Sequence, residues 1–119
     1  MKGNIEIYQS EDQEIVIDVS FDNDTVWLNR HHLSILFDRD IKTIGKHINN
    51  VFKEGELDNE ATVAKIATVQ NEGGRVVERQ VEHYNLDVVI SVGYRVKSKR
   101  GTQFRKWATK KLREFMVQG

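Results

Sequence analysis

The hydrophobic residues at the start of the chain fall in short runs that are typical of β-strands. Ile5–Tyr8 and Ile15–Val19 are separated by a polar stretch suited to a turn, which predicts a β-hairpin. Thr25–Leu28 can add a third short strand. A second pair of runs, Ala61–Val69 and Val76–Tyr84, is rich in Val, Ile and Thr and flanks a Gly-Gly turn. The pattern therefore predicts two β-hairpins.

Elsewhere the hydrophobic residues recur every three or four positions, which is the spacing of a buried helix face. The first such segment is Arg30–Phe37, with Asn29 as its N-cap. A second helix ends at Gly55. Two further helices are expected over Leu86–Arg95 and from about Thr102 to Val117. The predicted buried residues of the second helix are Ile41, Ile44, Ile48, Val51 and Phe52, and those of the last are Phe104, Trp107, Ala108, Leu112 and Phe115.

These elements predict a single compact domain of the α+β class. The chain of 119 residues fits one domain, and it contains no proline, no internal repeat and no low-complexity linker. We divide it into a helix-turn-helix at 29–54, a β-hairpin at 61–84 and a helical pair at 85–118. Gly93 is expected to let another element approach the first helix of that pair closely, and Gly101 is expected in the link between the two.

Charge is polarised along the chain although the net charge is zero, with 18 basic and 18 acidic residues. Residues 1–28 contain one basic and seven acidic residues, whereas residues 95–119 contain nine basic and one acidic. Such segregation indicates a positive surface for phosphate or for an acidic protein, and an acidic region that repels nucleic acid or packs elsewhere. A solvated basic helix would produce the same C-terminal pattern.

Candidate chemistry lies on the second predicted helix. A helix-turn-helix needs two short helices held at a steep angle by apolar residues, and Leu33, Phe37 and Ile44 can serve that purpose. The opposite face of the second helix carries cations and amides that can reach phosphates or base edges in a major groove. Any two amphipathic helices with a short link would share this appearance. The candidate residues are Lys42, Thr43, Lys46, Asn49, Asn50 and Lys53.

The turn between these two helices has an unusual composition. Asp38 stands where a turn glycine is often preferred, and it can adopt the left-handed conformation at some cost. Arg39 takes a place that is commonly a small apolar residue, so it is expected to turn outward and to add a phosphate contact.

The last predicted helix combines aromatic and basic residues. Phe104 and Trp107 could stack on unpaired bases, but at this spacing aromatics are more often core residues. The cations are the better candidates for phosphate contacts, each adding about 0.9 to the salt dependence of log affinity. They are Lys99, Arg100, Arg105, Lys106 and Lys110.

Three stretches, 25–57, 84–96 and 98–109, resemble the N-terminal region of the RhuM-type virulence protein family. They include Lys46-His47-Ile48-Asn49-Asn50 and Arg105-Lys106-Trp107. That region of the family is itself similar to phage antirepressor domains of the BRO-N kind. The resemblance implies a DNA-binding or phage-derived regulatory role, and a longer protein of which this chain is the N-terminal part. Asp38-Arg39-Asp40-Ile41 departs from the Gly-Val-Asp-Arg-like turn that the resemblance leads us to expect.

Other function classes have weaker support. The chain has no cysteine, no apolar run of membrane-spanning length and no secretory signal pattern, so we expect a cytoplasmic protein without a membrane partner. Its four histidines lack metal-site spacing, and the acidic run from Glu54 to Glu60 is expected to be a solvated link. No nucleophile triad or phosphate loop stands out, so we predict no enzyme, no cofactor and no small-molecule substrate.

Two hypotheses remain. The first is a regulatory module that binds double-stranded DNA, with a homodimer plausible because helix-turn-helix proteins often dimerise. The second is a protein-interaction or oligomerisation module of a larger virulence-associated effector, with residues 95–113 docking an acidic partner. A continuous positive surface from Lys42 and Lys46 to the C-terminal cations would favour the first.

Overall fold

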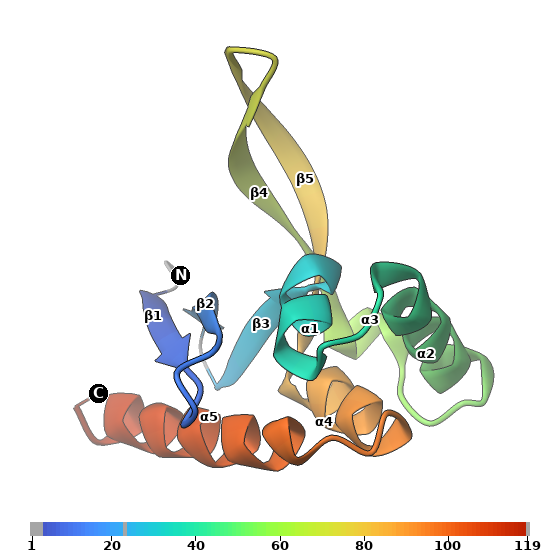
Figure 1. Cartoon of the computed structure of the whole chain (residues 1–119). Helices are drawn as coiled ribbons and strands as arrows, with labels where there is room; N and C mark the ends of the chain where they lie inside the picture. The colour runs from blue at the N-terminus through green and yellow to red at the C-terminus, as the bar shows by residue number, and fades with distance from the viewer. Residues whose placement is uncertain (1–3, 23, 119) are drawn as a thin grey trace.

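The computed structural model describes residues 4–22 and 24–118, and within these ranges it describes side chains from residue 5 to residue 114. Phe115, which we predicted on the apolar face of the last helix, lies outside the described side chains. The element order is β1, β2, β3, α1, α2, α3, β4, β5, α4 and α5. The chain is α+β, as predicted (Figure 1).

The strands form one antiparallel sheet in the order β1-β2-β3-β5-β4. Both predicted hairpins are present, but they are not separate. β3 joins them, because its residue Trp27 pairs with Asn85 at the end of β5. Local patterning cannot reveal this pairing, since the two partners lie far apart in sequence. The strands are β1 (Asn4–Gln9), β2 (Val16–Asp22), β3 (Thr25–Asn29), β4 (Val63–Glu72) and β5 (Arg75–Asn85).

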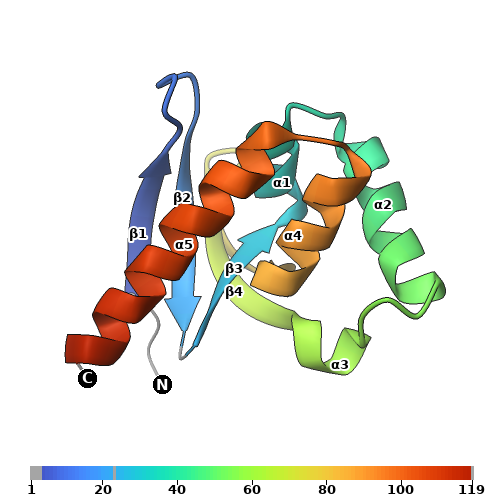
Figure 2. The ribbon, with the colours of Figure 1, turned by 90° about the horizontal axis from the view of Figure 1, so that it is seen from below.

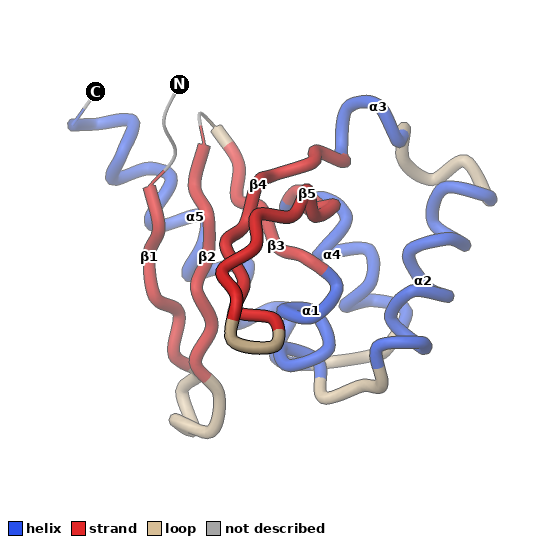
Figure 3. Tube along the Cα trace, turned by 90° about the horizontal axis from the view of Figure 1, so that it is seen from above, coloured by secondary structure: helices blue, strands red, loops and turns tan. Residues whose placement is uncertain are grey.

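The hairpin of β4 and β5 extends beyond the sheet as a two-stranded arm (Figure 1). Ten residue pairs join its strands, from Val63 with Tyr84 to Glu72 with Arg75. β3 pairs only with the last three residues of β5, so the rest of the arm has no neighbouring strand among the described residues. Seen from above, the arm rises from the middle of the molecule (Figure 3). The two turn glycines have positive φ, as the predicted turn requires.

The helices agree with the predicted ones except at two places. The last helix begins at Lys99, not Thr102, because the Ser98 hydroxyl accepts a hydrogen bond from the Arg100 amide at 3.2 Å and caps an earlier first turn. Gly101 therefore lies inside a helix and not in a link. A short helix at 59–62 begins within the predicted solvated link. The helices are α1 (Arg30–Phe37), α2 (Ile41–Lys53), α3 (Asn59–Thr62), α4 (Leu86–Arg95) and α5 (Lys99–Gln118).

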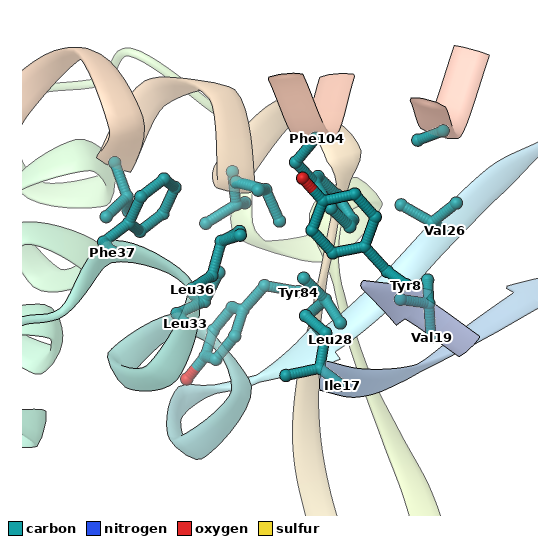
Figure 4. Close-up of a cluster of buried hydrophobic side chains, with 14 of the residues drawn as sticks. Tyr8, Ile17, Val19, Val26, Leu28, Leu33, Leu36, Phe37, Tyr84 and Phe104 are labelled. Atoms are coloured by element: carbon teal, nitrogen blue, oxygen red, sulfur yellow. The ribbon is translucent and has the colours of Figure 1, made fainter. Parts of the chain in front are cut away.

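Helix α5 covers one face of the β1–β2 hairpin (Figure 2). Phe104 is fully buried, and its ring meets Tyr8 edge to face at 5.1 Å between centroids. Trp107 is half-buried and packs edge to face on Tyr8 and Phe21 at 5.0 and 5.7 Å. Phe104 is therefore a core residue, and Trp107 packs against the core with part of its surface exposed. Figure 4 shows Phe104 and Tyr8 in the same cluster as Leu28, Leu36 and Tyr84.

Helices α4 and α5 cross where both contain glycine. A Cβ at Gly93 would lie 3.6 Å from the Gly101 Cα and 3.3 Å from the Phe37 ring. A Cβ at Gly101 would lie 3.2 Å from the same ring. The close approach predicted for Gly93 is thus confirmed, and its partners are Gly101 and the buried Phe37 of α1.

Candidate nucleic-acid interface

Helix α1 begins with a capping box. The Asn29 side chain accepts a hydrogen bond from the His32 amide at 2.8 Å, and the Asn29 amide donates to His32 Nδ1 at 3.1 Å. Burial, then the nearby His83 and His31, lower the pKa of His32 to about 4. The ring is therefore neutral at pH 7 and carries its proton on Nε2, which suits an acceptor at Nδ1.

The turn from α1 to α2 is formed by Asp38 and Arg39. Asp38 adopts the left-handed conformation, with φ 52°, as we predicted. Arg39 is exposed, as we predicted, and its guanidinium contacts backbone carbonyls. It donates to the carbonyls of Phe37, Asp38 and Val96 at 3.0, 3.1 and 3.0 Å. Carbonyls at the ends of α1 and α4 lie within its reach, and the phosphate contact of Arg39 stays a prediction.

Arg39→Ala is expected to lower the free energy of unfolding by about 1 kcal/mol, because it removes cap hydrogen bonds at two helix ends. Urea unfolding measures the change. Lys42→Ala is the matched control, since Lys42 is exposed and makes no hydrogen bond or ion pair with any described residue. Equal stability of both variants would contradict the capping role of Arg39.

The outer face of α2 carries the predicted site residues. Lys42, Lys46, Asn49 and Lys53 are exposed, and none forms a hydrogen bond or ion pair within the described chain. Their spacing of four, three and four residues places them on one helix face. Thr43 and Asn50 are half-buried beside that face. The side chains of this face are therefore free to meet a ligand.

The inner face of α2 fixes the position of the helix. Ile44, Ile48 and Val51 are buried in agreement with prediction, whereas Ile41 is 45% exposed because it starts the helix beside the turn. A Cβ at Gly45 would lie 2.9 Å from a guanidinium nitrogen of Arg30, so this glycine makes room for an arginine. Arg30 in turn donates from Nε to the Tyr84 hydroxyl at 3.1 Å.

An ion-pair clamp holds the end of α2 against α4. Arg95 donates to Glu54 and Glu56, at 2.9 Å each. The predicted solvated link thus includes two carboxylates with a specific partner. The pKa of His47 is lowered by burial first and then by the positive charges of Arg95, Lys46 and Arg39. Three cations, Arg95, Lys46 and Arg39, therefore lie near enough to His47 to disfavour its protonation.

Some basic residues of α5 form ion pairs with the acidic N-terminal region, and others do not. Arg100 pairs with Asp12 and Glu14 at 3.4 and 3.0 Å, and Lys111 pairs with Glu6 at 3.5 Å. The acidic region therefore packs against the basic helix. Lys106 and Lys110 line a hollow together with Glu11, while Arg105 lines a different groove beside α4. Lys99, Arg105, Lys106 and Lys110 remain exposed.

Sequence reasoning missed a groove of about 530 Å³ between the arm and the α1–α2 pair. Arg30, His31 and Ile41 line its helical side, and Gln70 and Gln80 line its arm side. One signal was available. In the run 64–82, polar residues occur on both faces of the predicted strands. This is typical of a ribbon that is exposed on both sides.

The described part of the chain contains neither a cluster of metal-ligating side chains nor a membrane-spanning helix. No three His, Asp or Glu side chains converge there in a way that could hold a metal ion. Within the same ranges, none of the helices combines the length and the apolar character needed to cross a membrane.

Residues 61–119 match the model of the virulence protein RhuM family. This segment comprises the arm, α4 and α5, so the chain is similar to that family over about half of its length. The match does not include α1 and α2. Searches of curated proteins and of solved structures found no match.

Proposed function

We propose that the chain is a DNA-binding regulatory module of the phage antirepressor type, acting in the cytoplasm as a binding domain and not as an enzyme. In this proposal α1 and α2 form a helix-turn-helix, and α2 enters the major groove of double-stranded DNA. The observation that carries the proposal is the free outer face of α2. Lys42, Lys46, Asn49 and Lys53 are exposed there and make no hydrogen bond or ion pair with described residues.

The residues that support α2 suit a helix that must present a fixed face. Buried Ile44 and Ile48 hold it to the core, Arg30 fills the space over Gly45, and Arg95 clamps its end. A rigid recognition helix loses less conformational entropy on binding. Phosphate contacts from α5 would come from Lys99, Arg105, Lys106 and Lys110, because Arg100 is already paired with two carboxylates.

The alternative, docking of residues 95–113 on an acidic partner, has fewer free cations than the sequence implied. Arg95, Arg100 and Lys111 each have an acidic partner within this chain. An acidic protein would have to displace these carboxylates, whereas DNA at α2 displaces none.

The test is fluorescence anisotropy of labelled mixed-sequence duplex DNA, from low to physiological salt. Replacing both Lys42 and Lys46 with alanine is expected to weaken binding about tenfold at fixed salt and to reduce the slope of log affinity against log salt by about 1.8. Two lost phosphate contacts account for that slope. Lys106→Ala/Lys110→Ala is the matched pair and is expected to weaken binding less.

Either of two results would change the assignment. A loss confined to the Lys106/Lys110 pair would move the interface to α5. Absence of binding even at low salt would refute the DNA-binding proposal and leave the protein-docking module.

A further inference from the structure

A second charged site lies between α4 and α5, away from the outer face of α2. It is an open groove of about 210 Å³. Side chains from both helices and from the link between them line it. We call it the α4–α5 groove, and its lining side chains are Ile90, Tyr94, Lys97, Ser98, Thr102 and Arg105.

The floor of the groove is formed by the glycines at the helix crossing. Gly93 and Gly101 both line it, although both are buried at the crossing and their Cβ positions face Phe37. On the other side of this crossing Phe37 blocks any passage into the core, because its ring lies within 3.4 Å of the Cβ position of either glycine. The groove is therefore a shallow site with a rigid floor.

The chemistry of the groove is cationic and aromatic. Lys97 and Arg105 contribute two positive charges, and among the described residues no acidic side chain lines the groove. Neither cation forms an ion pair within the described chain, in contrast to Arg95 and Arg100. The Tyr94 ring stands at the rim and is 79% exposed. Two unpaired cations beside an open aromatic face suit an anion that is joined to a planar ring.

The backbone at Lys97 gives independent support. Lys97 follows the C-cap residue of α4 and adopts the left-handed conformation, with φ 55°. The Ser98 amide donates to the Gly93 carbonyl at 3.1 Å, which is the hydrogen bond of a Schellman cap. Glycine is the usual residue at this position, because a side chain there costs energy. This position therefore places a lysine in the lining of the groove although glycine would relieve the backbone.

We propose that the α4–α5 groove binds a nucleotide, with the base on Tyr94 and the phosphate between Lys97 and Arg105. The hydroxyl of Thr102 adds a donor for a phosphate oxygen. The same chemistry is offered by a free mononucleotide and by an unpaired nucleotide of a single strand. The site does not depend on the proposed duplex binding at α2.

The experiment is an NMR titration of the full chain with adenosine 5′-monophosphate, following backbone amides. Saturable shifts are expected at the amides of Gly93, Gly101 and Thr102. Adenosine alone and inorganic phosphate alone are each expected to bind at least tenfold more weakly, because each lacks half of the recognised chemistry. A 5′-phosphorylated single-stranded tetranucleotide distinguishes the two sources: tighter binding than the monophosphate indicates a strand, and weaker binding indicates a free nucleotide.

The decisive variant is Lys97→Gly, because it removes the cation and also relieves the left-handed backbone. It is expected to weaken monophosphate binding at least tenfold while the melting temperature stays the same or rises. Asp38→Gly relieves the same kind of backbone outside the groove and is expected to bind normally. Lys42→Ala/Lys46→Ala is also expected to bind normally, so failure of the α2 proposal leaves this one intact.

Three results would overturn the proposal. They are no saturable binding at millimolar monophosphate, shifts that map to α2 instead of the groove, or unchanged affinity in Lys97→Gly.

Discussion

Gly101→Val is expected to lower the free energy of unfolding by about 3 kcal/mol, a large part of the stability of a domain of this size. The first added carbon would lie 3.2 Å from the Phe37 ring and 3.4 Å from the Gly93 Cα. One of these contacts is with backbone, and the other is with a ring that is 1% exposed and cannot move aside. The two γ carbons of valine would crowd the crossing further.

Helix propensity alone predicts the opposite sign. Gly101 lies inside α5, where replacing glycine is normally favourable by a few tenths of a kcal/mol. Urea unfolding of Gly101→Val, with the neighbouring exposed Thr102→Val as the control, separates the two effects. A stability equal to or above that of the unmodified chain would show that α4 and α5 do not meet at the two glycines.

Acidification from pH 7 to about 4.5 is expected to lower the free energy of unfolding by roughly 2 kcal/mol, a value discounted for the partial exposure of the histidine. The pKa of His32 falls from 6.5 in the unfolded chain to about 4 in the fold, mainly because of burial. Burial also lowers the pKa of His83, whose ring centroid lies 6.2 Å from that of His32. The unfolded chain therefore binds more protons between these values, and stability is lost as pH falls through that window.

The structural cause of the His32 effect is its position in the capping box. Protonation of Nδ1 would replace the acceptor of the Asn29 amide with a second donor. Lowered carboxylate pKa values, such as that of Glu56, act only at lower pH, near and below 4.5. Urea unfolding at intervals from pH 7.5 to 4.5 follows the loss.

His32→Gln is the matched variant for this test. Glutamine can accept the Asn29 amide in the same capping box but does not titrate. The variant is expected to keep its stability at pH 7 and to lose most of the pH dependence above 4.5. An unchanged pH profile would show that His32 is not the titrating group.

Much of the local structure was predictable because it depends on neighbouring residues. The helical spacing of Leu33, Leu36 and Phe37 correctly identified the buried face of α1. The caps at Asn29 and Asn85, and the turn at Gly73 and Gly74, also depend on short-range hydrogen bonds and on φ. The errors among these local predictions occurred at the ends of helices. At the start of α5, for example, one side-chain cap decides the boundary.

The candidate site was only partly predictable. The exposed side of α2 could be read from spacing, since burial of Ile44 and Ile48 places Lys42 and Lys46 opposite. The spacing could not show which of the individual cations have partners within the chain. Arg39 bonds to the carbonyl of Val96, which is 57 positions away, and Arg100 pairs with Asp12 across 88.

The sequence by itself determined the fold class, most of the helices and strands, and the polar face of α2. These follow from the alternation of apolar and polar residues and from caps and turns, which act over a few positions. The tertiary structure alone decided that β3 joins the two hairpins, that the acidic start packs on α5, and that Gly93 and Gly101 meet over Phe37. Each of these depends on contacts between distant segments, whose partners no local pattern specifies.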